Sequence, residues 1–305
     1  PLVFGTLKAT FYSMLFAVPL AIFGAIYTAY FMSPRMRSIV KPTIEIMAAL
    51  PTVILGFLAG LWLAPYLEKN LAGFFLIMLF VPSIVFLTSI LWPSVPRVIR
   101  ESVPDGWESL LLVPIVCLGI WSSLALGKVI EIQFFGGNLP HWLNLHHGIS
   151  YDQRNSIVVG IAIGFAVIPT IFSISEDAVF GVPRSLTMGS LALGATPWQT
   201  VTRVILLTAS PGIFSAVMIG MGRAVGETMI VLMATGNTPI MDLNIFQGFR
   251  ALSANIAVEM PESEVNSTHY RILFLAALVL FLSTFFVNTL AEVVRQRLRK
   301  KYANL

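Results

Sequence analysis

The sequence predicts an all-α, polytopic membrane protein. Hydrophobic residues make up 56% of the 305 residues and charged residues only 11%, whereas about a quarter of the residues of a soluble domain are charged. Seven apolar segments reach the length of roughly 20 residues that a transmembrane helix needs. We therefore expect residues 1–305 to form a single transmembrane domain of about seven helices.

The seven expected helices account for most of the chain. In chain order they cover residues 6–31, 44–66, 72–92, 109–131, 156–178, 211–235 and 271–294. Prolines inside or near these segments predict kinks, which membrane helices tolerate because neighbouring groups satisfy the freed carbonyls. These prolines are Pro19, Pro51, Pro82, Pro114 and Pro169.

The basic residues between the helices predict the orientation. Twelve Lys and Arg residues, Arg97 and Arg100 among them, lie in alternate connections and in the C-terminal tail, against three in the opposite connections. Basic loops stay on the cytoplasmic side, so we expect a cytoplasmic C-terminus and an outside N-terminus. The chain begins at Pro1 rather than Met, and an outside N-terminus agrees with a further helix upstream of this sequence.

Arg223 and Glu227 stand in the middle of the sixth predicted helix, where ionisable groups are costly and face a polar interior or a partner. Their spacing of four residues places both on one helical face. Either the pair is structural and neutralises itself, or Arg223 meets an anion in a translocation path while Glu227 holds or releases it. Small residues every four positions predict close packing of this helix; they are Gly212, Ala216, Gly220 and Ala224.

The longest internal connection, residues 179–210, predicts a helix–turn–helix beneath the membrane. Helix-forming runs flank a break at Gly194, and Thr196 before Pro197 has the pattern of a helix N-cap followed by proline at the first helical position. The hairpin is either an ordinary interfacial element or a docking element for a cytoplasmic protein.

The outer connections and three further acids carry weaker signals. Residues 132–155 contain three histidines beside Trp142, and we expect a surface loop there rather than a metal site because acidic or further histidine ligands are absent.

Glu45 is expected as a cap near the start of the second helix. Glu176 and Asp177 are expected as solvated acids without a role.

Two groups of motifs resemble a known family. LGATPW (193–198), followed by RVIL (203–206) and PGI (211–213), resembles the cytoplasmic coupling loop of ABC-transporter permeases. GRAVGETM (222–229) with GNT (236–238) resembles phosphate-specific permease subunits of the PstC/PstA type, and the PstC type more closely. GTL, VPLA and AALPTV near the N-terminus extend the likeness, which covers residues 4–66 and 157–294.

The chain departs from the family pattern at two places. The coupling loop carries Met188, Gly189 and Ser190 where the family usually has Glu-Ala-Ala, and Leu207 where a proline is usual. This suggests an altered contact with the ATPase. Residues 67–156 look like an inserted helix pair with an external loop, and an even number of added helices preserves the orientation of the later helices.

The resemblance implies a type I ABC importer permease of the bacterial inner membrane, which moves inorganic phosphate from periplasm to cytoplasm. The chain lacks a GxxxxGK[ST] phosphate loop, so we expect a non-enzymatic subunit without cofactors of its own. ATP and Mg²⁺ would bind a cytoplasmic ATPase dimer, beside a PstA-type permease and a periplasmic phosphate-binding protein. The implied substrate-pathway residues are Arg223, Glu227, Thr228 and Asn237. The implied ATPase-coupling residues are Met188, Gly189, Ser190, Gly194, Ala195, Pro197, Trp198 and Arg203.

Three alternatives stay open. The chain could be a permease for another oxyanion, since such permeases share the coupling loop. A secondary anion transporter or channel would explain Arg223 and Glu227 but leaves the cytoplasmic hairpin without a purpose. An intramembrane enzyme lacks a suitable set of residues, because no apolar segment holds paired aspartates, a histidine cluster or a Ser/His arrangement.

Overall fold

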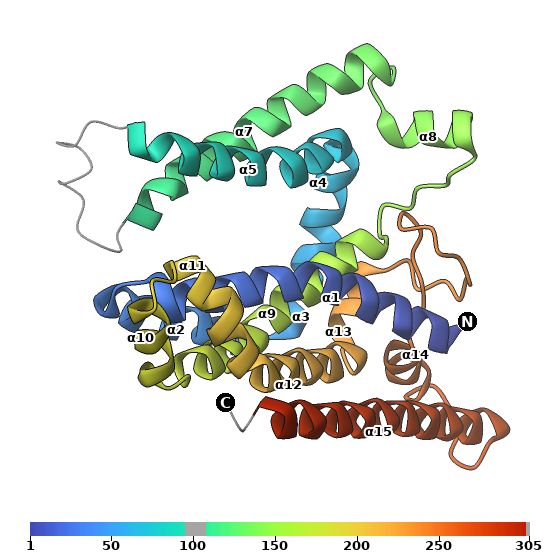
Figure 1. Cartoon of the computed structure of the whole chain (residues 1–305). Coiled ribbons are helices and arrows are strands. Elements are labelled where there is room, and N and C mark those ends of the chain that lie inside the picture. The colour runs from blue at the N-terminus through green and yellow to red at the C-terminus, as the bar shows by residue number, and fades with distance from the viewer. Residues whose placement is uncertain (95–107, 303–305) are drawn as a thin grey trace.

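The computed structural model of the chain describes residues 1–94 and 108–302. Over this part the secondary structure is helical and contains no strand (Figure 1), which confirms the predicted all-α class. The first helices are α1 Leu2–Ile26, α2 Pro34–Met47, α3 Thr52–Leu58, α4 Ala64–Lys69, α5 Leu71–Leu91, α7 Glu108–Phe134 and α8 Leu139–His147. The later ones are α9 Ser156–Phe180, α10 Arg184–Ala192, α11 Pro197–Thr200, α12 Leu206–Val225, α13 Met229–Ala234, α14 Leu252–Glu259 and α15 Thr268–Tyr302.

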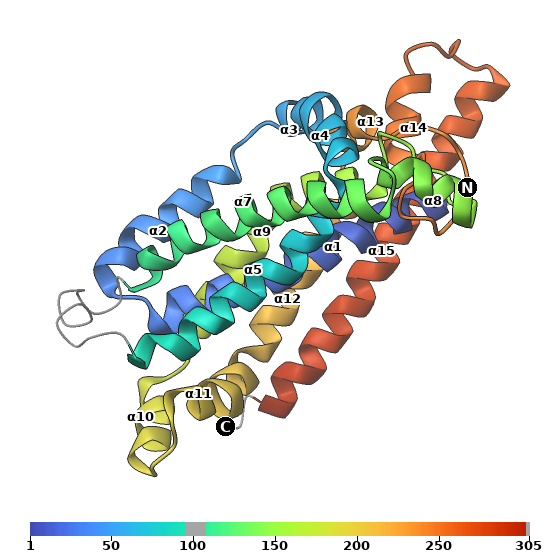
Figure 2. The same cartoon turned by 90° about the horizontal axis from the view of Figure 1, so that it is seen from above.

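The number of membrane-length helices agrees with the prediction of about seven. Within the described residues, six helices are long and apolar enough to cross a membrane, or seven if one bent pair is a single span. Figure 2 shows the N-terminus at the same end of the molecule as α8 and α14, and the C-terminal end of α15 at the opposite end with α10 and α11. Arg97 and Arg100, which contribute to the predicted orientation, lie outside the described residues.

The core consists of α1, α9 and α12, which pack closely because their contact faces carry small residues. Ala17 and Ala21 of α1 are fully buried, and Gly164 of α9 lies so close to α1 that a Cβ there would stand 2.7 Å from the Phe16 ring. The predicted small-residue face of α12 is confirmed, because Ala216 is fully buried and a Cβ on Gly220 would stand 2.5 Å from Ile171 of α9.

The second predicted span, residues 44–66, is interrupted at Pro51, where the sequence predicts a kink, and it is wrong as one continuous helix. The chain breaks between α2 and α3, and the two segments Pro34–Met47 and Thr52–Lys69 are bent by 82°. Pro51 causes the break, since proline donates no backbone hydrogen bond and disfavours a helical conformation at the residue before it. Its own backbone is extended, and α3 starts directly after it. A π-helical turn at Ala59–Leu63 then joins α3 to α4.

The sixth predicted span, residues 211–235, is also wrong as a single helix. The helix begins at Pro197, passes through a π-helical turn at Val201–Ile205 and ends with α12 at Val225. Three residues then separate it from the short helix α13. The Glu227 carbonyl, which lies in this break, accepts a hydrogen bond from a residue far along the chain. Ser253 Oγ of α14 donates to it at 2.9 Å.

The helix pair expected within residues 67–156 is present as α5 and α7. The two helices pack along each other and stand away from α1, α9 and α12 (Figure 1). Gly73 and Gly127 meet at their contact, where a Cβ on Gly127 would overlap the Gly73 backbone. The loop that comes next, which the sequence predicts to be external, contains a helix that the sequence did not predict, α8, which is capped by the Asn138 side chain.

Candidate functional site

The side chain of Arg223 lies between α12 and α9. It occupies the last turn of α12 and is half-buried, and its Nη1 donates to Thr170 Oγ1 at 2.9 Å. In the described part of the chain this is the one hydrogen bond of the guanidinium, which offers further N–H donors in a planar fork. Those N–H donors can bind an oxyanion, and no carboxylate has to leave the guanidinium first.

Glu227 does not lie where the sequence predicts. Because α12 ends at Val225, Glu227 belongs to the break and does not share a helical face with Arg223. Its Oε1 accepts from the Ile230 amide at 3.4 Å, at the start of α13. The described side chains include no ion pair between Arg223 and Glu227. Of the two alternatives, the self-neutralising pair is therefore not the arrangement in this structure.

The break between α12 and α13 brings irregular backbone next to Arg223. In a transmembrane helix, non-helical backbone is stable only where protein covers it or where it lines a water-filled cavity, and transporters place substrate sites at such breaks. Gly226 in the break is exposed. Close contacts with α3 and with the π-helical turn after it fix the far side of the break. A Cβ on Gly56 of α3 would stand 2.9 Å from the Met229 carbonyl oxygen, and a Cβ on Gly60 of the turn would overlap the Met233 carbonyl oxygen.

The other two candidate pathway residues lie at opposite ends of α13. Thr228 is the last residue of the break, and its Oγ1 donates to the Gly226 carbonyl at 3.1 Å. Asn237 follows the six residues of α13, so about 9 Å of helix separates it from the break. It adopts a left-handed backbone conformation with φ of 54°, and its amide donates to Thr235 Oγ1 at 3.0 Å. The structure therefore groups Arg223, Glu227 and Thr228 and leaves Asn237 apart.

The predicted helix–turn–helix is present as α10 and α11. The Thr196 cap is confirmed, since its Oγ1 accepts from the Gln199 amide at 3.2 Å and the Gln199 side chain accepts from the Thr196 amide. Gly194 turns the chain between the helices with φ of 85°, a conformation that favours glycine. The tip is apolar and open, with Leu193 91% exposed and Trp198 62% exposed.

The remaining coupling-loop residues line the same element. Met188 is 65% exposed, and a side chain at Gly189 would point into open space. The hydroxyl groups of Ser190 and Thr200 lie 3.0 Å apart and join α10 to α11. Ala195 is half-buried, whereas Pro197 and Arg203 are exposed. Exposed apolar side chains gathered at the tip of a hairpin are typical of a protein-docking surface.

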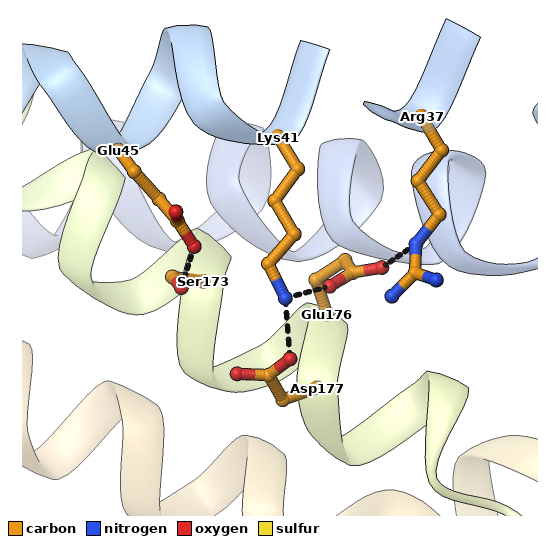
Figure 3. Close-up of polar contacts among 6 residues, drawn as sticks. All are labelled: Arg37, Lys41, Glu45, Ser173, Glu176 and Asp177. Carbon is orange, nitrogen blue, oxygen red and sulfur yellow. Dashed lines mark hydrogen bonds and ion pairs between the residues drawn. The ribbon is translucent and has the colours of Figure 1, made fainter. Parts of the chain in front are cut away.

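Glu176 is a structural residue that sequence reasoning missed. It is fully buried near the end of α9, not solvated, and it forms ion pairs with Arg37 and Lys41 of α2 (Figure 3). Asp177 also pairs with Lys41. Arg37 and Lys41 are four residues apart and thus on one face of α2, a pattern that could have suggested an acidic partner on the same side of the membrane.

The cap predicted at Glu45 is wrong. Glu45 lies in the last turn of α2 rather than at a helix N-terminus, and its Oε1 accepts from Ser173 Oγ of α9 at 2.8 Å. Because the chain breaks at Pro51, Glu45 belongs to the end of α2 and not to the start of a membrane helix. The acid therefore joins two helices.

Known transport proteins are similar to this chain over most of its length. A model of the family described as binding-protein-dependent transport system inner membrane component matches residues 17–300. The probable ABC transporter permease protein YqgH of Bacillus subtilis is 26% identical over 297 residues, which is 97% of this chain and 71% of that protein. The phosphate transport system permease protein PstC 1 of Mycobacterium tuberculosis is 30% identical over 228 residues, 72% of this chain and 68% of that protein.

A third relative adds to this similarity. The phosphate transport system permease protein PstC of Mesorhizobium japonicum is 28% identical over 243 residues, covering 77% of this chain and 73% of that protein. No solved structure matches the chain. The family match begins within α1 and ends within the last turn of α15, so it includes every described helix between them.

Proposed function

The chain belongs to the family of binding-protein-dependent transport system inner membrane components, and we propose that it is the permease subunit of an ATP-driven importer of inorganic phosphate. The substrate assignment is supported by the similarity to PstC phosphate transport permeases. The observation that carries the mechanism is the position of Arg223, a half-buried guanidinium with one neutral partner beside a broken membrane helix.

Phosphate suits the chemistry at Arg223. A guanidinium offers paired N–H donors to a tetrahedral oxyanion and keeps its charge at ordinary pH. Since Glu227 is not paired with it, we propose that phosphate binds the free donors of Arg223 directly. Thr228 can add a hydroxyl at the same break, while Asn237 would act at another point of the path. In this view Glu227 shapes the break by capping α13.

We propose that a separate ATPase supplies the energy for transport. The sequence has no GxxxxGK[ST] motif, so ATP and Mg²⁺ bind a separate cytoplasmic ATPase dimer. The surface formed by Met188, Leu193 and Trp198 provides the apolar anchors that such a docking site needs, since interface energy concentrates in a few buried aromatic and apolar side chains. A second permease subunit and a periplasmic phosphate-binding protein complete the importer.

The orientation follows from the positive-inside rule. It places α10, α11 and the C-terminus in the cytoplasm and the N-terminus, α8 and α14 in the periplasm. A secondary transporter or channel remains the main rival. It leaves the exposed apolar tip at Leu193 and Trp198 without a purpose, and this tip favours the ATP-driven importer.

Uptake of radiolabelled phosphate tests the function. Cells that lack their own phosphate importers would express the complete operon, with or without this chain. We expect uptake only with the chain and with ATP, and competition by unlabelled phosphate but not by sulfate. Absence of chain-dependent phosphate uptake, or competition by sulfate as strong as that by phosphate, would contradict a phosphate-specific importer. Uptake without the ATPase gene would favour the secondary transporter.

A further inference from the structure

Four charged residues join α2 to the end of α9, and we call them the α2–α9 clamp: Arg37, Lys41, Glu176 and Asp177. Arg37 Nε lies 2.6 Å from Glu176 Oε1, and Lys41 Nζ lies 2.8 Å from Glu176 Oε2. Lys41 also pairs with Asp177. Figure 3 shows both basic side chains reaching from α2 to the acids of α9.

Glu176 is the centre of the clamp because it is fully buried, whereas the side chain of Asp177 is 64% exposed. A buried carboxylate is stable only when its charge and its oxygens are compensated. Each oxygen of Glu176 faces a different cation, and the two cations lie one helical turn apart. Glu176 therefore fixes both the position and the rotation of α2 against α9.

Two further contacts extend the clamp along α2. The Arg37 guanidinium lies 3.4 Å from the centre of the Phe180 ring, at the last residue of α9. At the other end, Glu45 accepts a hydrogen bond from Ser173. The whole length of α2 from Arg37 to Glu45 is thus tied to residues 173–180 of α9.

The clamp lies between the docking element and the break. α9 ends at Phe180, and only three residues separate it from α10. On the other side, α2 continues through its 82° bend into α3 and the π-helical turn after it. Gly56 of α3 and Gly60 of that turn contact the backbone of α13. A connected series of contacts therefore runs from α10 through the clamp and α3 to the break beside Arg223.

We infer that Glu176 is a positioning residue that makes α2 move as one rigid unit with the end of α9, so that displacement of α10 by the ATPase reaches α3 and α13. This inference rests on the proposed ATP-driven import. Without the clamp, α10 would still dock on the ATPase and ATP would still be hydrolysed. The movement of α10 and of the end of α9 would, however, no longer be passed on to α2. A merely stabilising ion pair would instead lower the amount of folded protein and leave the coupling of the remainder unchanged.

The test compares ATP hydrolysis and phosphate uptake by the complete complex in proteoliposomes. For Glu176→Gln we expect ATP hydrolysis within about twofold of wild type and a rise of about tenfold in ATP consumed per phosphate transported, within the usual range of coupling between sites. Asp177→Asn is the matched control, because Glu176 keeps both cations, and its ratio should stay at the wild-type value. A wild-type ratio for Glu176→Gln would overturn the inference.

A crosslink covers the case in which Glu176→Gln fails to assemble. Glu45→Cys and Ser173→Cys, in a Cys117→Ser background, would be joined by a short thiol-reactive crosslinker in the assembled complex. If α2 and the end of α9 move together, the crosslinked importer transports phosphate as fast as the same variant before crosslinking. Loss of uptake on crosslinking would contradict a rigid unit. Failure of the phosphate assignment is distinguishable, since it would abolish uptake by the wild type as well.

Discussion

Arg223 of α12 and Thr170 of α9 are joined by a hydrogen bond of 2.9 Å immediately before α12 ends. The contact holds the guanidinium beside the break at a fixed point between two core helices. Because threonine is neutral, it orients the cation without cancelling its charge. Arg223 is thus positioned for an anion instead of being paired with Glu227.

Thr170→Val should impair transport through this contact. The change keeps the side-chain shape but removes the acceptor, and a hydrogen bond to a charged group contributes about 1.5–3 kcal/mol. We expect phosphate uptake to fall about tenfold at equal membrane levels, since 1.4 kcal/mol corresponds to a factor of ten. Thr170→Ser, which retains the hydroxyl, should transport nearly normally. Equal uptake by the Val and Ser variants would show that Thr170 does not position Arg223.

Leu193→Asp should detach the ATPase. Leu193 is 91% exposed, so the substitution should change the folding free energy by no more than about 0.5 kcal/mol. A charge in the centre of an apolar docking site should cost about 2 kcal/mol or more of binding, which weakens retention of the ATPase about 30-fold. Co-purification of the ATPase with the tagged permease measures this, and Leu193→Met is the matched control. Retention of the ATPase by Leu193→Asp would place the docking surface elsewhere.

Gly60→Ala should destabilise the protein. A Cβ at this position would overlap the Met233 carbonyl oxygen of α13, and overpacking typically costs about 1–3 kcal/mol. We expect a lower midpoint of thermal unfolding in detergent. Gly189→Ala is the control in α10, where a Cβ meets open space and alanine should stabilise the helix by up to about 1 kcal/mol. Similar midpoints for both variants would mean that the π-helical turn at Gly60 can move away from α13 without loss of stability.

Local features of the structure could be predicted from the sequence. The Thr196 cap depends on residues 196–199 alone, so the N-cap and proline pattern is sufficient to locate it. The close packing of α12 follows from its small residues: Ala216 is fully buried, and Gly212 and Gly220 do face α9. Apolar length likewise predicts most of the membrane helices, because hydrophobic burial in the bilayer needs no partner to be specified.

Features that depend on distant contacts could not be predicted. The end of α12 at Val225 is stabilised by Ser253, 26 residues after Glu227, and an apolar run that continues through Gly226 gives no sign of the break. The burial of Glu176 depends on Arg37, which is 139 residues away. A local pattern presents Glu176 and Asp177 as equivalent acids, and only the packing of α2 distinguishes them.

Uptake of phosphate by the Arg223→Gln variant tests the central claim most directly. The assembled complex would be reconstituted in proteoliposomes with ATP, and Arg271→Gln, at an exposed position at the start of α15, would serve as the matched control. Loss of a partly buried cation that contacts the anion costs at least about 2–3 kcal/mol, so we predict a fall of about 100-fold with the ATPase still bound. Uptake equal to that of Arg271→Gln would contradict the account and make Arg223 a structural residue.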